Sequence, residues 1–583
     1  MPLNILKANG TKSKKTRALV LVLIFSAAAV SGLTYLLVKY TSRDLGPKAP
    51  KVEALNEAKA VETLNRLYNT LNVITLPPIK ENVDLEAVDM ASILPDIEKF
   101  PLQVGPVPDT MWVEIVSSVE KATPGQGGSD TNSWLLSMAE KFNEADISQK
   151  GRNVSVAIRA LPSGLAMDYI KSGKYVPDAF TPSNILWGEA LKASGIPAKL
   201  LAEKLIGNVA GIVIHKAKYD EFIRKYQTVD VKTLSAAVAE GSFVMGYTNP
   251  MASSTGANFL MSLLYSANEA NPLSPESQQA FEKFQNNVPF VAYTTLQMTE
   301  SAKSGALDGF VFELQQFVNS PDLVNNYVFT PFGVRHDSPV YALGNLERDK
   351  IELLTMFITY CRFPESQDLA RKAGFNQNEA YPGEPKIRGQ FLSMAQSLFK
   401  EKKTGNREIM AVFVADTSGS MAGAPLRLLK QSLIHGSKSI DSNNYIGLVQ
   451  FSDQVQIAVP LQQFDLNQRS IFTGAVNNMS SGGGTAMYDG LITAEKMLHD
   501  AKPAHPSAKM MIIVLTDGES VNGYSFAETA PMFKGLKIPI YTIGYNANLA
   551  ILEDVSALNE AASLAADTDD VVYQIQSFFN AEM

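Results

Sequence analysis

Oxygen-bearing side chains gather at three places in the C-terminal third of the chain. The apolar run Ile409–Ala415 leads into Asp416-Thr417-Ser418-Gly419-Ser420, and the run Met510–Thr516 leads into Asp517-Gly518-Glu519. Between them lies the segment Ser481-Gly482-Gly483-Gly484-Thr485. Hydroxyl, carboxylate and water oxygens are the ligands that Mg²⁺, Mn²⁺ and Ca²⁺ prefer. The pattern therefore predicts a site for a hard divalent cation. Its candidate residues are Asp416, Ser418, Ser420, Thr485 and Asp517.

The surrounding sequence predicts the elements that bring these residues together. Strands are expected at Ile409–Ala415, Tyr445–Phe451, Met510–Thr516 and Ile538–Ile543, and helices at Pro425–Ile440, Met487–His499 and Phe526–Lys534. Alternating strands and helices, with the strands apolar throughout, predict a doubly wound parallel sheet that is covered on both faces. Ligands of such a sheet bind beyond the carboxyl ends of its strands. Because Asp416 and Asp517 each follow a strand, we expect both at that edge.

Turns of this kind also have a simpler interpretation. Ser418 and Ser420 can be turn or N-cap residues, and Asp517-Gly518 can be a bare turn. That interpretation does not explain why both turns end strands, or why a glycine-rich loop with Thr485 lies between them. Glycine lets a loop bend closely around an ion, which is what Gly419 would do in the first turn.

Residues 407–583 resemble a von Willebrand factor type A domain, since the pattern described above resembles its metal-ion-dependent adhesion site. The resemblance implies that Ser418, Ser420 and Thr485 ligate the cation directly, whereas Asp416 and Asp517 act mainly through water. Mg²⁺ is the expected cation, with Mn²⁺ or Ca²⁺ as alternatives. Neutral hydroxyls leave most of the cation's charge uncancelled, and Mg²⁺ retains waters that a ligand can replace. The expected partner is therefore a protein that offers an Asp or Glu carboxylate.

The composition limits the classes of function. The chain has 583 residues, a formal net charge of −8, 45% hydrophobic residues and 19% charged residues. This length is too great for one core and predicts about three or four units. The acidic balance, with no basic run outside the N-terminus, argues against a nucleic-acid partner. Cys361 is the only cysteine, which excludes an intrachain disulfide and a cysteine-based zinc site.

The N-terminal region predicts membrane attachment. Residues 18–38 carry no charge and are long enough to cross a bilayer as a single transmembrane helix. Five basic residues precede them, so the positive-inside rule places residues 1–17 in the cytoplasm and the bulk of the chain outside the cytoplasm. A cleaved signal peptide is the alternative, because Ala27-Ala28-Ala29 offers small residues near a possible cut. Residues 39–109 contain many prolines and are expected to form a connector or stalk, with one helical patch at Val52–Leu71.

The middle of the chain has a different pattern. Residues 110–400 alternate short apolar runs with amphipathic stretches, which predicts a two-lobed α/β fold. They resemble a bacterial extracellular solute-binding protein of the periplasmic-binding kind. The segment 246–256, with the sequence GYTNPMASSTG, follows a strand, precedes an apolar helix and looks like the second-lobe ligand loop of that family. Free N–H groups and hydroxyls at a helix start suit an anion or another polar ligand.

Nine polar side chains are the candidate contacts of a small polar or anionic solute. They follow strand-like runs in the first lobe or lie in the loop just described. They are Ser117, Ser118, Ser163, Ser183, Thr248, Asn249, Ser253, Ser254 and Thr255. The alternative is that these residues only cap helices and turns. Glu313 can face the cleft or be solvated, and the domain as a whole can instead be a spacer or a protein-binding module.

The expected function is that of a membrane-anchored extracytoplasmic binding protein, not an enzyme. Its C-terminal domain would engage a protein, and its middle domain would bind or sense a solute. No P-loop or dinucleotide fingerprint is present in the sequence, and nothing resembles a Ser-His-Asp set. One alternative is a docking component of a transport or surface assembly complex. Another is a metal-assisted hydrolase, which needs a base beside the cation, with Glu519 the nearest candidate in the sequence.

Overall fold

The computed structural model describes most of the chain after residue 51. The described residues are 52–84, 89–124, 131–289, 291–292, 298, 307–403, 407–518, 520–545, 549–559, 563–566, 572–573, 575 and 578–579. The expected tail at 1–17 and transmembrane helix at 18–38 lie outside these residues. Among the helices within them, none has the length and apolar character needed to cross a bilayer.

The C-terminal sheet has seven strands in the order β1-β16-β15-β14-β17-β18-β19. Their bounds are β1 Val73–Thr75, β14 Ile409–Asp416, β15 Tyr445–Phe451, β16 Val455–Gln463, β17 Lys509–Thr516, β18 Ile540–Tyr545 and β19 Ser563–Ala566. All pairs are parallel except the antiparallel pair β15–β16. The four expected strands are confirmed. Strand β16 was not expected, because polar residues interrupt its apolar ones.

Side chains of the central strand β14 alternate between two apolar cores, as the two-residue period of a strand requires. Phe413 and Ala415 lie in a core that α17 (Ala424–Ser437) and α18 (Leu466–Asn477) cover. Val412 and Val414 lie in the opposite core, beneath α19, α20 and α21. These helices span Met487–Ala501, Phe526–Leu536 and Leu549–Ser556. The expected sheet covered on both faces is therefore confirmed.

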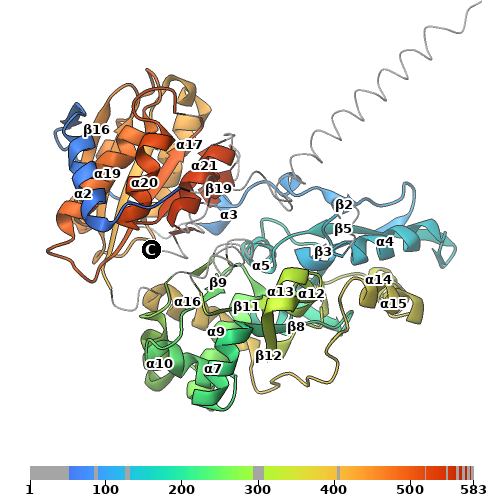
Figure 1. Ribbon diagram of the computed structural model, residues 1–583. Coiled ribbons are helices and arrows are strands. Elements are labelled where there is room, and N and C mark those ends of the chain that lie inside the picture. Colours follow the sequence, from blue (N-terminus) through green and yellow to red (C-terminus); the bar gives the residue numbers. More distant parts are fainter. Residues whose placement is uncertain are drawn as a thin grey trace, which may run out of the picture.

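The described part of the expected connector belongs to this C-terminal unit. Helix α2 (Glu57–Tyr68) packs against α19 and α20 (Figure 1), and its Leu64 and Leu67 lie in the same core as Val412. Strand β1 then pairs in parallel with β16. The segment that follows runs along α18, where the Ser470 hydroxyl donates to Glu81 O at 2.7 Å. Residues 52–84 are therefore not a free stalk, and the middle domain is inserted between β1 and β14.

The first lobe of the middle domain is built on a sheet in the order β2-β5-β3-β6-β13-β7, with β4 paired to β5. Its strands are β2 Leu102–Val104, β3 Met111–Ser117, β4 Ser148–Gln149, β5 Arg152–Ala160, β6 Ala179–Thr181, β7 Ala198–Ala202 and β13 Val340–Leu343. Its helices are α3 Met90–Ile93, α4 Trp134–Glu144, α5 Ser163–Ser172, α6 Ile185–Ala193, α14 Arg348–Cys361 and α15 Pro364–Lys372.

The second lobe has a five-stranded sheet in the order β10-β9-β11-β8-β12. Its strands are β8 Val209–His215, β9 Met245–Thr248, β10 Val291–Ala292, β11 Gly309–Glu313 and β12 Tyr327–Arg335. Its helices are α7 Lys216–Tyr226, α8 Val231–Ala239, α9 Ser254–Ala267, α10 Pro275–Gln285, α12 Leu314–Val318 and α13 Pro321–Asn326. Two sheets in one domain confirm the expected two-lobed α/β fold.

Two segments connect strands of the first sheet to strands of the second, at 203–208 and at 336–339. We call these segments the first and second hinge crossings. Helix α16 (Leu392–Lys402) packs against α9 and α10 of the second lobe and α6 of the first. Five short 3₁₀ turns complete the described elements: Ile97–Lys99, Val119–Lys121, Gly389–Phe391, Gly419–Met421 and Ala557–Asn559.

We predict that the Leu64→Ala substitution destabilises the C-terminal unit by about 2–5 kcal/mol, because it leaves a cavity where a fully buried leucine met α19 and α20. Hydrogen exchange of the β14 and β17 amides measures this loss locally. Glu62→Ala, on the exposed side of the same helix, is the matched control and should leave exchange unchanged. Equal protection in both variants would show that α2 does not stabilise this unit.

Candidate metal site and solute cleft

The carboxyl ends of β14 and β17 lie side by side at one rim of the C-terminal sheet. The two strands are parallel and in register, with Ala415 opposite Leu515. Asp416 and Thr516 are therefore neighbours, and the Thr516 hydroxyl donates to Asp416 Oδ2 at 2.5 Å. Both side chains are buried. The strand pairing thus holds the Asp416 carboxyl at the base of the rim.

The turn after β14 folds back over this carboxyl. Ser418 N–H donates to Asp416 Oδ1 at 2.7 Å. The hydroxyl oxygens of Ser418 and Ser420 lie 3.0 Å apart, and the Ser420 hydroxyl donates to Asp517 Oδ1 at 2.8 Å. Asp517 follows β17, so this chain of hydrogen bonds joins the two strand ends. It includes four of the five side chains that the sequence singled out.

The glycine-rich loop lies against the same turn. Gly482 N–H donates to Thr417 O at 2.9 Å, and Gly419 N–H donates to Gly483 O at 3.0 Å. Gly483 has a φ of +80°, and a Cβ atom there would lie 2.4 Å from a neighbouring carboxylate oxygen, so this position requires glycine. The loop leads two residues later to the buried Thr485, the fifth expected side chain.

The charges at the rim fit a cation. Burial raises the pKa of the Asp416 carboxyl, hydrogen bonds from Ser418 and Thr516 oppose this, and the negative charge of Asp517 adds to the increase. A nearby positive charge would favour the ionised form of such a carboxyl. No group of three or more His, Cys, Asp or Glu that could hold a metal occurs in the described ranges, so the candidate site depends on hydroxyls as well as carboxylates. This oxygen-only set suits a hard divalent cation.

In the middle domain, the two lobes contact each other through residues that the sequence singled out. Trp187 Nε1 donates to Ser254 Oγ at 2.9 Å, and the Ser254 hydroxyl donates to Ser163 Oγ at 3.2 Å. A Cβ atom on Gly164 would lie 2.1 Å from Met251 O, which shows how closely the lobes approach. The cleft is therefore closed at this point.

The other first-lobe candidates are buried and bonded within their own lobe. The Ser117 hydroxyl donates to Ser118 O at 3.0 Å, and the Ser118 hydroxyl donates to Glu120 Oε1 at 2.6 Å. Lys121 Nζ, which is fully buried, donates to Ser118 Oγ. Ser183 is buried as well, and its hydroxyl contributes to the environment of the Glu120 carboxylate.

The second-lobe candidates surround the start of α9. The Thr248 hydroxyl donates to Ser253 Oγ at 2.8 Å, and Ser253 is the N-cap residue, so this part of the capping interpretation is correct. The Thr255 hydroxyl donates to Glu313 Oε1 at 2.6 Å, and Glu313 is buried rather than solvated. The Asn249 side-chain nitrogen is buried and has no hydrogen-bond partner within the described chain.

Sequence reasoning missed three buried polar residues around Glu313 and its neighbours, namely Asn208, Asn258 and His336. They come from three separate segments and share no spacing that a sequence pattern would reveal. His336 itself lies in the segment that connects β12 to β13.

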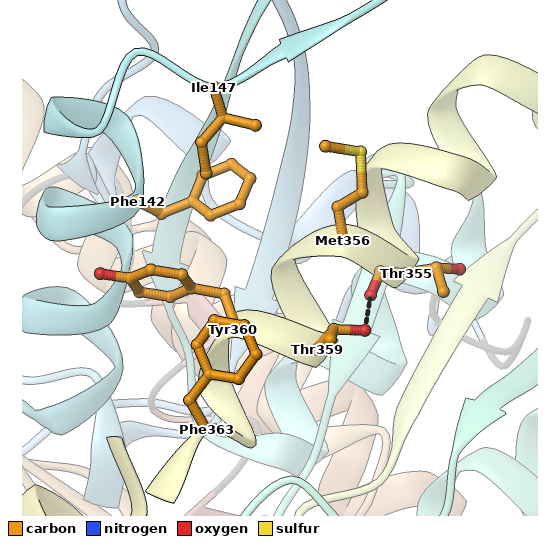
Figure 2. A pocket seen from close by; sticks show the side chains of 7 residues that line it. All are labelled: Phe142, Ile147, Thr355, Met356, Thr359, Tyr360 and Phe363. Carbon is orange, nitrogen blue, oxygen red and sulfur yellow. Dashed lines mark hydrogen bonds between the residues drawn. The ribbon is translucent and has the colours of Figure 1, made fainter. Parts of the chain in front are cut away.

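A separate hollow lies between α4 and α14 of the first lobe (Figure 2). It has a volume of about 270 Å³, and its walls include Phe142, Met356 and Tyr360. The rings of Phe142 and Tyr360 meet edge to face at 5.5 Å. The Thr359 hydroxyl donates to Thr355 O at 2.8 Å within the helix. The hollow therefore offers mainly apolar contact and lies apart from both predicted sites.

Comparison with known proteins identifies both domains. Residues 411–582 match the family model of the von Willebrand factor type A domain, and residues 127–376 match that of the bacterial extracellular solute-binding protein. The chain joins a von Willebrand factor type A domain to a bacterial extracellular solute-binding domain. Domains of the first family often bind divalent cations through a metal-ion-dependent adhesion site.

Similar proteins align with only parts of the chain. Inter-alpha-trypsin inhibitor heavy chain H1 of Mesocricetus auratus is 29% identical over 198 residues, which are 31% of this chain and 21% of that protein. The chain thus matches about a fifth of the length of that relative. A von Willebrand factor type A structure from Catenulispora acidiphila has a TM-score of 0.28 and 19% identity, and covers 30% of this chain and 42% of its own. Iron-bound HitA from Pseudomonas aeruginosa has a TM-score of 0.36 and 14% identity, and covers 50% of this chain and 99% of its own.

We predict that Mg²⁺ stabilises the von Willebrand domain, since a ligand that binds only the folded state at 100 times its Kd adds about 2.7 kcal/mol. The measurement is the shift in Tm of the full chain on adding Mg²⁺ and then a chelator. Asp416→Asn and Asp517→Asn should lose the shift, whereas Asp500→Asn, at an exposed acid of α19, should keep it. If the Tm of the wild type stays the same on addition of Mg²⁺, Mn²⁺ or Ca²⁺, the prediction of a cation site is contradicted.

Proposed function

We propose that this protein binds a protein partner outside the cytoplasm through a divalent cation held by its von Willebrand factor type A domain. The observation that supports this most strongly is the chain of hydrogen bonds from Asp416 through Ser418 and Ser420 to Asp517. It gathers hydroxyl and carboxylate oxygens from two strand ends at one rim. An extracytoplasmic location is in keeping with the extracellular solute-binding family of the middle domain.

In this proposal the five residues divide into direct ligands and residues that act through water. Ser418, Ser420 and Thr485 would hold the cation directly, and Asp416 and Asp517 would hold it through water. Bound Mg²⁺, or Mn²⁺ or Ca²⁺ in its place, would supply a coordination position for an Asp or Glu carboxylate of the partner. The neutral hydroxyls would not cancel the positive charge of the cation, and the remaining charge favours binding of the partner's carboxylate.

We also propose that the middle domain binds a small polar or anionic solute between its lobes. The buried nitrogen of Asn249 favours this, because it follows β9 in the predicted ligand loop and lacks a partner within the described chain. A buried donor without a partner costs roughly 1–3 kcal/mol, which a solute oxygen would recover. The contact between Ser163 and Ser254 would have to open for the solute to enter.

Membrane attachment through residues 18–38, with residues 1–17 in the cytoplasm, completes the proposal. We propose no reaction, since neither matched family is an enzyme family and such domains are typically non-catalytic. Glu519, the candidate base of a metal-assisted hydrolase, lies outside the described residues.

A crosslinking pulldown of the full chain in Mg²⁺ tests the cation-dependent interaction. We predict that Asp416→Ala abolishes capture of the partner while the domain stays folded, because the variant removes a carboxylate from the rim. Asp500→Ala removes an exposed carboxylate elsewhere in the same domain and should capture the partner as the wild type does. Circular dichroism confirms the fold of each variant. Capture that is equal in Mg²⁺ and in excess chelator would rule the interaction out.

Solute binding is tested separately by a thermal-shift screen of the full chain against small carboxylates, phosphate, sulfate and amino acids. For a solute that raises the Tm, we predict that Asn249→Ala weakens its affinity about tenfold, through the loss of one hydrogen bond. Asn287→Ala, an exposed asparagine of the same lobe, is the matched control. If both variants bind that solute as well as the wild type, Asn249 is not a ligand.

A further inference from the structure

The Glu313 carboxylate is the centre of a buried network in the middle domain. It lies at the end of β11, and only 8% of the residue is exposed. The Thr255 hydroxyl donates to Oε1 at 2.6 Å, and Asn208 Nδ2 donates to Oε2 at 2.9 Å. His336 Nδ1 lies 2.6 Å from Oε1. Three side chains therefore converge on one carboxylate.

The three partners come from the segments that govern closure of the domain. Asn208 ends the first hinge crossing and His336 begins the second, while Thr255 lies in the first turn of α9. The backbone N–H of Gln315 also donates to Asn208 Oδ1, at 3.1 Å. One carboxylate thus ties both hinge crossings to the second lobe.

Neighbouring amides determine the tautomer of His336. The side-chain nitrogens of Asn184 and Asn258 lie 3.0 Å and 3.1 Å from His336 Nε2. The oxygen of each amide accepts a backbone N–H, from Leu186 and Val334 respectively, so each NH₂ group faces the ring. Nε2 is therefore the acceptor. The neutral ring then carries its hydrogen on Nδ1, which lies 2.6 Å from Glu313 Oε1 without the alignment of a hydrogen bond. This contact, together with the Asn184 amide at Nε2, connects Glu313 to the first lobe.

A buried ammonium group of the first lobe also belongs to this environment. Lys121 is fully buried, and its Nζ donates to Thr181 O at 3.0 Å. Burial lowers the pKa of the Lys121 amine, and the negative charges of Glu120 and Glu313 oppose that decrease. The negative charge of Glu313 thus acts on a buried amine of the first lobe as well as on donors of the second lobe and the hinge.

These surroundings are those that an anionic ligand would need. A helix start, a hydroxyl and amide donors all favour a negative charge, and a buried carboxylate is tolerated only when such groups satisfy it. We infer that Glu313 acts as an internal ligand, whose carboxylate holds the two lobes closed without a solute. Beyond solute binding, the Glu313 side chain then fills the position between the lobes and the hinge, and that position is specific for a carboxylate.

The test is chemical rescue of Glu313→Ala in the full chain. Without the side chain, the donors lose their acceptor, and we expect the Tm to fall by roughly 5 °C or more. Small-angle scattering should show a larger radius of gyration. Formate or acetate at about 100 mM should restore roughly half of the lost Tm or more, because the free carboxylate binds in the vacated space. The wild type is measured in parallel, and rescue is the rise in the Tm of Glu313→Ala beyond any rise that the same anion causes in the wild type.

Glu313→Gln is the matched variant, since it fills the space and removes the charge. It should lower the Tm as well, because one amide oxygen can replace only one of the two carboxylate oxygens, and neither anion should rescue it. Sodium chloride at equal ionic strength and Glu365→Ala, at an exposed glutamate of α15, control for general salt effects.

Equal responses of Glu313→Ala and Glu313→Gln to acetate would overturn the inference, as would an unchanged Tm in both. If Glu313→Ala does not fold alone, recovery of its fold by formate supports the inference, and failure of both anions to recover it overturns the inference. None of these outcomes depends on whether a solute binds at Asn249.

Discussion

The rim of the C-terminal sheet depends on one buried carboxyl group, that of Asp416. A buried carboxylate is costly unless hydrogen bonds satisfy it, and here a strand and a turn both contribute donors. Thr516 reaches it only because β14 and β17 are paired in register, and Ser418 N–H reaches it only because the turn folds back. The same contacts bring the Ser418 and Ser420 hydroxyls next to Asp517. The position of every donor at the rim therefore follows from satisfying this group.

A second buried carboxylate, that of Glu313, lies in the middle domain, where the groups around it have the opposite electrostatic character. The two sites differ in what surrounds them. At the rim, two carboxyls and neutral hydroxyls leave negative charge that suits a cation. In the middle domain, a hydroxyl and an amide donate to a single carboxylate, and an imidazole nitrogen lies 2.6 Å from it. In the functions proposed here, the buried acid of one domain would attract a cation from outside, and that of the other would bind groups within the domain.

The sequence predicted well whatever depends on neighbours along the chain. The apolar runs before Asp416 and Asp517 could only be buried strands, and the glycines before Thr485 indicated a tight loop. Contacts between distant segments left no such pattern. Helix α2 packs on helices more than 400 residues away in the sequence. Its amphipathic pattern would be the same if it formed part of a stalk, so the pattern could not reveal this contact. The residues around Glu313 were missed because Asn208 and His336 meet only when both hinge crossings are in place. Strand β16 was missed because polar residues interrupt the apolar pattern that would indicate a strand.

The insertion of the middle domain between β1 and β14 has a mechanical consequence. Tension between the N-terminal side of α2 and a partner held at the rim would pass through α2, β1 and the C-terminal sheet alone. The inserted domain branches off this line and bears none of the load. The lobe opening that the proposed solute entry requires would therefore take place off this line of force.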